Sequence, residues 1–436
     1  MIVHYKLEQL LCLNTMLDIK FIRENKELIQ KAAKKKHIEF DVDRLVKVDE
    51  KRRVLLSQVE EKRAEQKVAN NKIVKANSEE RETILEKMKK LKTDLEAEEE
   101  KLKETMKEWQ MLMLSVPNIP DSSVPDGGSE ADNEEIKKWG DIPEFNFEPK
   151  SHIEVMTNLG MADFERGTKV AGFRGYFLKG SGAMLSFAIW RYALDFFLSR
   201  GLDFIVAPSL VRREPLLGTG FLPQSEDDLY KVQDGKYLSG TAEVATMGMY
   251  QDEVLEKNSL PKKILSFSPC FRREAGSHSK DVKGLIRVHE FFKVEQVVLC
   301  EASHEESVKW HEWLHRNTEE FIESLKIPYR TVINCGSDLG LGQVKKLDIE
   351  LWVPLEHTYR EIGSTSYFHD FQTRRLNIKY RDTGDKLKYA HSLNATAIAT
   401  PRILVSLVEN FQQTDGSVKI PDVLVPYMNG LSVIKK

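Results

Sequence analysis

The sequence predicts an α+β protein in which a long antiparallel helical arm precedes a mixed body of strands and helices. Two observations support this fold class. Near the N-terminus, apolar side chains recur at steps of three and four residues over two long stretches, which is typical of paired amphipathic helices. Further along, short β-rich runs alternate with helical stretches; these are residues 204–206, 264–267 and 294–299 for strands, and 183–198 and 303–325 for helices.

Composition limits the class of protein. The chain has 436 residues, 41% of them hydrophobic, which is enough for more than one packed domain. Its 65 basic and 68 acidic side chains nearly cancel, so a nucleic-acid contact would require a local basic patch. The four cysteines lie far apart without a CxxC pair, which argues against a disulfide framework and a cysteine-based zinc site. With no apolar stretch long enough to span a membrane and no signal-peptide pattern, the sequence predicts a cytoplasmic protein.

The predicted domains follow from shifts in composition. Residues 1–15 precede the first regular pattern and are either an N-terminal extension or the result of a misassigned start, with Met16 as the alternative first residue. Residues 16–114 contain the arm. Residues 115–135 are rich in proline, glycine, serine and acids, the composition of an exposed linker, and residues 136–436 form the body.

The arm is predicted as two helices that fold back on each other. The apolar series run over residues 45–73 and 84–102, and a polar stretch separates them. Helices of this kind would extend roughly 40 to 50 Å. A dimerising coiled coil and a solvated spacer are open alternatives, but a basic outer half suits the phosphate backbone of a nucleic acid. Its five basic side chains, against one acid, are Lys62, Arg63, Lys67, Lys72 and Lys75.

The most informative part of the body is residues 267–299, FSPCFRREAGSHSKDVKGLIRVHEFFKVEQVVL. It predicts two antiparallel strands joined by a polar loop at 276–284, with Arg272 and Glu274 on one face of the first strand. On the second strand, alternation separates an apolar face from a polar one. A solvent-exposed sheet surface would also be charged, yet an aromatic ring among arginines suits stacking on a nucleobase, with the arginines binding phosphates. The polar face comprises Arg287, His289, Phe291, Lys293 and Glu295.

A second notable stretch is NATAIATPR, residues 394–402. Apolar spacing after it predicts a largely buried helix, with Pro401 and Arg402 in its first turn. An arginine is electrostatically unfavourable at this positive end of the helix dipole. Either the guanidinium reaches solvent or a neighbouring acid, or an anion binds where the helix end and the arginine point together.

The hairpin resembles motif 2 of the class II aminoacyl-tRNA synthetases: Arg272, one residue, Glu274, a loop, then Phe291 four residues past Arg287. Arg402 falls where motif 3 has its arginine. The stretches SGTAEV, YREIGSTSYFHDFQTRR and GTGFLPQSEDDLYKV, together with MLDIKFIREN and the arm, are similar to signatures of bacterial-type seryl-tRNA synthetases. The resemblance extends from Met16 to about residue 430 and implies a class II antiparallel-sheet catalytic domain over 136–436.

The resemblance also implies an activity. Such an enzyme activates L-serine with ATP and Mg²⁺ to seryl-adenylate and transfers serine to the 3′ end of tRNA(Ser), with tRNA(Sec) as a further candidate. Because the serine carboxylate is already ionised, no general base is needed, and catalysis rests on positioning and charge neutralisation. A homodimer, built through motif 1 at about residues 172–208, and tRNA binding by the basic arm are implied as well.

The implied roles of individual residues follow the motifs. The catalytic arginines would be Arg272 at the α-phosphate, Arg287 at the bent triphosphate and Arg402 at the γ-phosphate. Glu274 would hold the adenine amino group, with Phe291 stacked under the ring. Glu361 and Ser364 would hold Mg²⁺. The serine-binding set would be Thr241, Glu243, Arg272, Glu295 and Thr396, and among these the buried carboxylates Glu243 and Glu295 are favoured because burying a carboxylate without a cationic partner is costly.

Four features depart from the family pattern. Ala395, Thr396, Ala397 and Pro401 replace glycines and a serine; Gly240 and Gly363 stand where many relatives have proline and serine; and residues 1–15 precede the usual start. Two alternatives therefore stay open, a paralogue that delivers an amino acid to a carrier protein and an inactive RNA-binding homologue. The arm argues against the first. An inactive homologue would be expected to have lost at least one of five residues that this chain retains, which are Arg272, Glu274, Arg287, Glu361 and Arg402.

Overall fold

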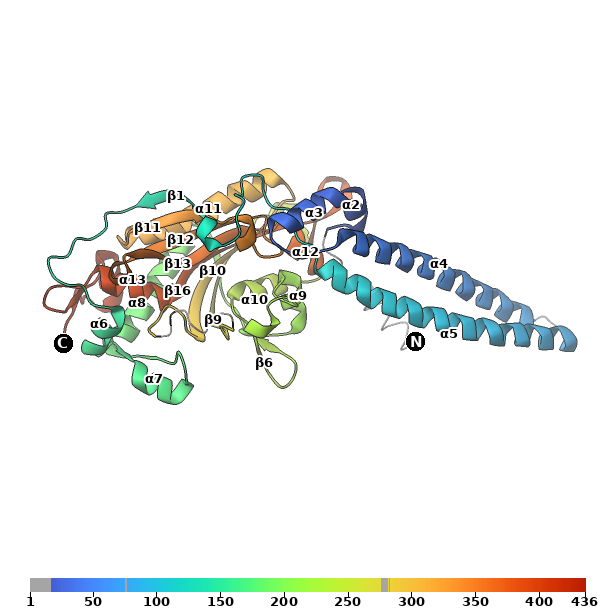
Figure 1. Ribbon diagram of the computed structural model, residues 1–436, viewed down its shortest axis with the longest axis horizontal. Helices are drawn as coiled ribbons and strands as arrows, with labels where there is room; N and C mark the ends of the chain where they lie inside the picture. The colour runs from blue at the N-terminus through green and yellow to red at the C-terminus, as the bar shows by residue number, and fades with distance from the viewer. Residues whose placement is uncertain (1–16, 75–76, 276–280, 282) are drawn as a thin grey trace. The chain divides into compact units, whose positions relative to one another are not determined.

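The computed structural model describes residues 17–74, 77–275, 281 and 283–436 (Figure 1). The expectations for residues 1–15 and for Lys75 therefore concern positions outside the described ranges. The chain forms two compact units. The first ends at Pro117 and leaves out residues 35–37, and the second comprises residues 35–37 and 118–436. Within the described ranges, no helix has both the length and the apolar character to cross a membrane.

The first unit is helical and confirms the predicted pair of long helices. Helix α4 begins after Asp41, whose side chain accepts a hydrogen bond from the Arg44 amide, and α5 begins with a reciprocal capping box between Asn77 and Glu80. At 32 and 37 residues, they extend roughly 48 and 55 Å. The two helices fold back on each other (Figure 1). They pack through Leu55, Val59, Leu95 and Leu102; the unit's helices are α2 (Ile19–Glu24), α3 (Lys26–Lys35), α4 (Val42–Ile73) and α5 (Ser78–Leu114).

The second unit is built on an eight-stranded sheet. Neighbouring strands are antiparallel except for the parallel pair β4 and β9 at one edge. This confirms an α+β body with an antiparallel sheet. In spatial order the strands are β1 (Glu134–Trp139), β11 (Tyr329–Ile333), β12 (Lys345–Val353), β13 (Thr358–Tyr367), β16 (His391–Thr400), β10 (Glu290–Cys300), β9 (Lys262–Phe271) and β4 (Asp203–Val206).

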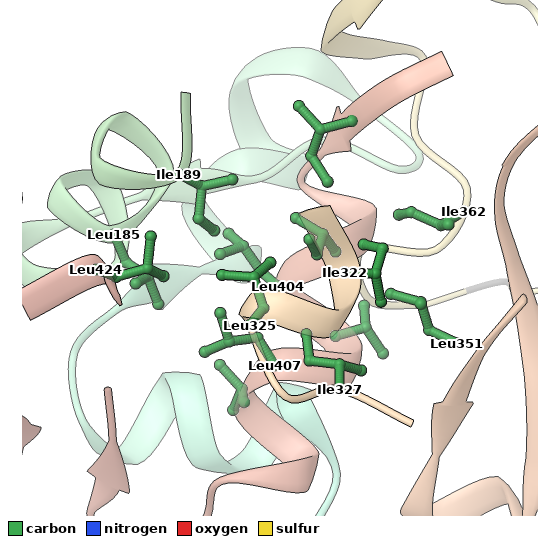
Figure 2. Packing of buried hydrophobic residues seen from close by; sticks show 14 of the residues in the cluster. Leu185, Ile189, Ile322, Leu325, Ile327, Leu351, Ile362, Leu404, Leu407 and Leu424 are labelled. Carbon is green, nitrogen blue, oxygen red and sulfur yellow. The ribbon is translucent and has the colours of Figure 1, made fainter. Parts of the chain in front are cut away.

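Helices cover the sheet and form its main core. Figure 2 shows side chains of α8, α11 and α13 packed together with residues of β12 and β13. The labelled aliphatic residues, among them Ile189, Ile322 and Leu404, are almost wholly buried, and burial of this kind stabilises the fold by about 1.5–3 kcal/mol per side chain. The helices of the unit are α6 (His152–Asn158), α7 (Phe164–Ala171), α8 (Gly180–Leu198), α9 (Arg213–Thr219), α10 (Ala242–Gly248), α11 (His304–Ser324), α12 (Phe371–Arg375) and α13 (Arg402–Asn410).

Short strands form four small sheets around this body. They are β15 (Leu387–Tyr389), β14 (Lys379–Arg381) and β8 (Val254–Glu256); β5 (Leu210–Val211), β7 (Tyr237–Leu238) and β6 (Tyr230–Lys231); β2 (Ala162–Asp163) with β3 (Phe177–Leu178); and β17 (Val418–Lys419) with β18 (Val433–Ile434).

Part of the segment expected to be an exposed linker is packed against the body. Asn118 is 4% exposed, and its side-chain amide donates to the backbone oxygens of Gly342 and Phe368 at 3.0 and 2.8 Å. Val124 is buried, and Asp121 accepts a hydrogen bond from Tyr367. Composition alone could not show this, because a polar segment can satisfy its hydrogen bonds against another backbone as well as against water.

Candidate active site

Strands β9 and β10 form the predicted hairpin, but the first site residues lie just beyond its strands. β9 ends at Phe271, so Arg272 and Glu274 follow the strand and do not lie on it, and Arg287 precedes β10. The sequence-based placement on the strands was therefore wrong. Glu274 has a positive φ of 55°, which regular strand pairing does not allow. The backbone amide of Arg272 still donates to the oxygen of His289 at 3.0 Å, so the two limbs stay in contact.

Both faces of β10 are buried, which excludes the alternative of a solvent-exposed charged surface. On the polar face, Lys293 and Glu295 are 6% and 1% exposed. Phe291 is buried and packs with Cys270. The guanidinium carbon of Arg272 lies 5.4 Å from the centre of the Phe291 ring, a cation–π contact. The arginine predicted at the α-phosphate therefore lies next to the ring predicted to stack on adenine.

Arg287 binds two carboxylates at the base of the loop. Its Nη1 donates to Glu274 Oε2 and its Nε to Asp281 Oδ2, both at 3.0 Å. Desolvation lowers the pKa of Arg287, but these two carboxylates outweigh it and raise the pKa above its usual value. Asp281 also pairs with Arg360. A guanidinium in this setting is charged and can bind an anion through two parallel hydrogen bonds.

Arg402 is the first residue of α13, as predicted, with Pro401 preceding the helix. Residues 394–400, directly before it, belong to strand β16. Arg402 Nη1 donates to the backbone oxygen of Glu361 at 2.9 Å and lies 3.7 Å from the Glu361 carboxylate, while Nε donates to the oxygen of Ile286 at 3.1 Å. The arginine therefore does reach a neighbouring acid, and that acid is itself a predicted site residue.

Four of the residues predicted to form the serine pocket are buried polar groups, namely Thr241, Glu243, Glu295 and Thr396. Thr241 caps α10, its hydroxyl accepting from the amide of Glu243 at 3.4 Å. Glu295 pairs with Lys293, a cationic partner that the sequence reasoning did not assign. The hydroxyl of Thr396 lies 3.4 Å from both the Glu295 carboxylate and the Lys293 ammonium. Three separate chain segments, at α10, on β10 and on β16, thus bring their polar groups together.

The two carboxylates of this pocket hold their protons more tightly than free ones. Burial, and then the charge of Glu295, raises the pKa of Glu243 to about 7, although Gln372 donates a 2.6 Å hydrogen bond to it. Burial likewise raises the pKa of Glu295, against the opposing effect of Lys293. A cationic ligand in the pocket would favour the ionised forms of both groups.

The predicted metal-binding residues, Glu361 and Ser364, both lie on strand β13 and face carboxylates of β12. Ser364 on β13 is paired with Asp348 on β12, and Glu361 on β13 is paired with Glu350. Burial raises the pKa of Asp348 to about 7 in spite of nearby Lys346. One oxygen of Asp348 is buried and lacks a hydrogen-bond partner among the described residues.

The acidic face formed by Glu361, Ser364 and Asp348 suits a cation that takes most of its ligands from water and substrate. Among the described residues, no three histidine, cysteine or acidic side chains are close enough to hold a metal ion by themselves. Mg²⁺ typically binds through one or two carboxylates together with water and substrate phosphates. The residues present are therefore compatible with Mg²⁺ brought in with a nucleotide.

Arg272 lies between the pocket and the acidic face. Its positive charge lowers the pKa of both Glu295 and Glu361 and also that of Arg402. Arg287 and Glu274 act on Arg402 as well. The five residues that sequence reasoning grouped across 130 positions are thus within electrostatic reach of one another.

Comparisons with known proteins agree with this geometry over the whole chain. The family model "Seryl-tRNA synthetase N-terminal domain" matches residues 16–120, and "tRNA synthetase class II core domain (G, H, P, S and T)" matches residues 227–411. Among curated proteins, the serine–tRNA ligase of Deinococcus radiodurans is 46% identical over 421 residues, which cover 96% of this chain and 99% of the relative. The corresponding protein of Thermodesulfovibrio yellowstonii is 42% identical, with coverage of 96% and 100%.

The chain belongs to the seryl-tRNA synthetase family. Solved structures support the same assignment: the seryl-tRNA synthetase of Pyrococcus horikoshii complexed with ATP has a TM-score of 0.86 and 38% identity, covering 96% of this chain and 99% of that one. The cytoplasmic serine–tRNA ligase of Naegleria fowleri in complex with AMP has a TM-score of 0.83 and 32% identity, with the same coverage.

One departure from the usual seryl-tRNA synthetase pattern has a steric explanation. A β-carbon added to Gly363 would lie 2.5 Å from Cβ and 2.7 Å from Cγ2 of Thr396 on the adjacent strand β16. Real β-carbons do not approach so closely, so in this backbone Thr396 requires glycine at position 363. Gly240 is less constrained, because an added β-carbon would meet Arg272 Cγ at 3.3 Å.

The arm of this seryl-tRNA synthetase uses part of its basic charge internally. Lys62 pairs with Glu98 and Arg63 with Glu99, at 2.7 and 2.8 Å, so these two cations connect α4 to α5. Lys67 and Lys72 are exposed. The predicted tRNA-binding set is therefore divided between cations that stabilise the hairpin and cations that point to solvent.

Sequence reasoning missed several residues that the fold brings to the site. Lys293 was placed on the polar face of the second strand but was given no role, although it is two positions from Glu295. Asp281 is six residues from Arg287 in the loop of the hairpin, but no periodic pattern marks that contact. Asp348 and Gln372 are different, since only the packing of separate segments places them beside Ser364 and Glu243.

Proposed function

We propose that this protein activates L-serine with ATP, forming seryl-adenylate and pyrophosphate, and then transfers serine to the 3′ end of tRNA(Ser). The observation on which this rests is the juxtaposition of Arg272, over the ring of Phe291, with the buried carboxylate Glu295. The relatives named serine–tRNA ligase support it over nearly the whole chain. Transfer to tRNA(Sec) is a further candidate activity.

ATP would bind along the arginines. Arg272 would neutralise the α-phosphate, Arg287 the bent triphosphate and Arg402 the γ-phosphate, while adenine stacks on Phe291 and its amino group meets Glu274. Arg287 carries the charge that this role needs, because Glu274 and Asp281 raise its pKa, and phosphate oxygens would replace these carboxylates at its Nη1 and Nε. The Pyrococcus horikoshii relative in complex with ATP supports nucleotide binding in this fold.

The reaction needs positioned charge and no general base. The serine carboxylate is ionised at neutral pH and attacks the α-phosphorus in line; the oxygen bridging to the β-phosphate leaves with pyrophosphate. Arg272, Arg287 and Arg402 would neutralise the negative charge that crowds the reacting phosphates. Mg²⁺, held by Glu361 and Ser364, would supply further neutralisation when bound, and the buried oxygen of Asp348 beside Ser364 supports a cation there.

Serine would be recognised through its ammonium and hydroxyl groups. Glu295 would receive both, with Thr241, Glu243 and Thr396 completing the pocket. The Thr396 hydroxyl, 3.4 Å from Glu295, fixes the orientation of that carboxylate. A buried site built for a hydroxyl can reject an analogue without it by about 10⁴ to 10⁵, which would exclude alanine. Threonine would have to be excluded by shape.

The arm would bind tRNA through its exposed basic side chains. The family match over residues 16–120 supports this use over delivery to a carrier protein, for which an arm has no purpose. We expect Lys67→Glu with Lys72→Glu to weaken tRNA binding and to reduce the salt dependence by about 1.5 in log–log slope. Lys47→Glu, an exposed lysine near the other end of α4, is the matched control. Lys62 and Arg63 variants would weaken the hairpin itself, and Lys75 belongs to the same predicted set.

The decisive experiment for the arm separates the two half-reactions. Serine-dependent ATP–pyrophosphate exchange should stay within twofold of wild type in the Lys67→Glu, Lys72→Glu variant, while charging of tRNA(Ser) falls at least tenfold. Equal loss of both activities would contradict a division of labour between arm and body.

We also propose that the protein is a homodimer. The region 172–208, predicted to form the subunit interface, exposes apolar side chains beside a hollow of about 840 Å³ lined by Trp190, Phe267 and Phe292. Phe187 is 62% exposed at this hollow, and exposed apolar patches of this kind mark interaction sites. Phe187→Glu should convert a dimer to a monomer in sedimentation velocity; a wild-type monomer at micromolar concentration would contradict the proposal. A cytoplasmic location, where tRNA, ATP and serine are found, completes it.

A further inference from the structure

A buried histidine and glutamate connect the helix that begins with Arg402 to the segment that contains Arg287. His152 is the first residue of α6 and is 6% exposed; Glu409 is near the end of α13 and is 1% exposed. The Nδ1 atom of His152 lies 2.9 Å from Glu409 Oε1. Neither residue belongs to the predicted site, and both are fully enclosed by protein.

The hydrogen bonds define the protonation state of the histidine ring. The amide of Leu285 donates to His152 Nε2 at 3.2 Å, so Nε2 has a free lone pair and no proton. In a neutral imidazole the proton is then on Nδ1, from which it is donated to Glu409 Oε1. Glu409 therefore acts as an acceptor, and it also receives the backbone amides of His152 at 2.8 Å and Leu355 at 3.2 Å.

This relay of hydrogen bonds, from Glu409 through His152 to the amide of Leu285, fixes the segment that returns from the loop of the hairpin. Gly284, directly before Leu285, has φ +87°, and an added β-carbon would lie 2.3 Å from His152 Nε2. The imidazole ring thus lies close against the backbone at Gly284 and hydrogen-bonds the next amide. The residue after Leu285 is Ile286, whose oxygen accepts from Arg402 Nε, and the residue after that is Arg287.

Two of the three arginines that the proposed function places on the triphosphate, Arg287 and Arg402, are therefore connected through one buried pair. Arg402 and Glu409 are on the same helix, seven residues apart. Glu409 hydrogen-bonds the ring of His152, which accepts a hydrogen bond from the amide of Leu285. The oxygen of the next residue, Ile286, accepts a hydrogen bond from Arg402. Small displacements of such groups are costly for catalysis, because a misplacement of 1 Å can reduce a rate about 100-fold.

We propose that His152 and Glu409 are positioning residues for ATP binding and adenylate formation, which hold the Gly284–Arg287 segment in register with the start of α13. This inference rests on the proposed function for its kinetic consequence. A purely structural role, satisfying a buried carboxylate, would affect stability without affecting ATP specifically.

Two substitutions distinguish these roles. His152→Asn places an amide nitrogen near the position of Nδ1, which keeps the partner of Glu409 and removes the acceptor for Leu285. His152→Gln places its amide oxygen further out, where it can accept from Leu285; the ring donor to Glu409 is lost, but the backbone amide of residue 152 still donates to Glu409 Oε1. His315→Asn is the matched control, because His315 is also a buried histidine with two ring hydrogen bonds, to Thr365 and Thr331.

The experiment uses the full-length protein and measures ATP binding by calorimetry, the KM of ATP and of serine in pyrophosphate exchange, and urea unfolding. For His152→Asn we expect ATP affinity to fall and the KM of ATP to rise about tenfold, with the KM of serine within twofold of wild type. His152→Gln should restore ATP binding to within about threefold, and His315→Asn should leave it unchanged.

Several results would overturn the inference. These are an unchanged KM of ATP in His152→Asn, an equal rise in the KM of ATP and serine, or the same loss of ATP affinity in His315→Asn. Measuring the wild-type protein in the same assays distinguishes a failure of this inference from a failure of the proposed function. If wild type binds ATP and exchanges pyrophosphate while His152→Asn matches it, only the positioning role is refuted; if wild type neither binds ATP nor exchanges, both are refuted.

Discussion

Replacing Gly363 by alanine should damage the serine pocket through Thr396. The added β-carbon would lie 2.5 Å from Thr396 Cβ, where ordinary contacts begin at 3.4 Å, so the two strands or the threonine must move by about 1 Å. Overpacking of this kind costs about 1–3 kcal/mol of unfolding free energy. Gly363 therefore supports the pocket although it makes no polar contact with it.

The effect on serine follows from the hydroxyl of Thr396. A displacement of about 1 Å would break its 3.4 Å contacts with Glu295 and Lys293. Loss of one hydrogen bond to a charged group costs about 2 kcal/mol, which corresponds to a rise in the serine KM of roughly 30-fold. Pyrophosphate exchange at saturating ATP measures this KM, and urea unfolding measures the stability.

A second substitution tests whether the contact is the cause. Thr396→Gly removes both clashing carbons, so Gly363→Ala should cost little stability in that background, with a coupling energy of at least ~1 kcal/mol. Thr396→Ala retains Cβ and should not rescue. Gly128→Ala is the control, because its added β-carbon would meet the nearest atom at 3.8 Å. Additive effects of Gly363→Ala and Thr396→Gly, or equal rescue by Thr396→Ala, would refute the steric reasoning.

Four further predictions concern charge at the site. The ammonium of serine favours the ionised form of Glu243, whose pKa is about 7, so serine binding at low pH must release the proton of Glu243. The serine KM should therefore fall about tenfold from pH 6 to pH 8. Glu243→Gln should abolish this pH dependence. In the absence of serine, the raised pKa means that the native state holds a proton the unfolded chain has lost, so stability should decrease as pH rises from 4.5 to 7, and urea unfolding of Glu243→Gln should show a flatter profile. Arg402→Lys should lower kcat/KM for ATP about 100-fold, because an ammonium cannot hold Ile286, Glu361 and a phosphate together; a loss under threefold would contradict its role. Glu361→Gln should raise the Mg²⁺ concentration for half-maximal exchange roughly tenfold, and an unchanged requirement would contradict metal binding there.

Local sequence patterns were sufficient for the elements and for the residues of the motifs. Helical periodicity predicted α4 and α5, and strand alternation predicted the pairing of β9 with β10, because both patterns are set by the period of a single element. The positions of Arg272 and Glu274 beyond the strand end were not predictable in the same way. Strand termination there depends on the positive φ of Glu274, which no apolar pattern reports.

Contacts between distant segments account for what the sequence could not predict. Residues 394–400 were not predicted as a strand, because a run of alanine and threonine lacks an apolar alternation; β10 and β13 on either side bury them. In the sequence, Gly363 was only a departure from the family pattern. The structure gives the reason, because a β-carbon at position 363 would clash with Thr396 on the neighbouring strand. The relay through His152 and Glu409 joins residues 257 positions apart and has no signal in either local sequence.

The central claim is that this site activates serine. ATP–pyrophosphate exchange with wild-type protein, Mg²⁺ and one amino acid at a time tests it most directly, with serine, alanine, threonine and glycine compared at equal concentration. The structure predicts exchange with serine, and at least 10³-fold lower kcat/KM with alanine because the polar pocket would be left unpaired. Exchange with none of the four amino acids, or equal exchange with serine and alanine, would contradict it.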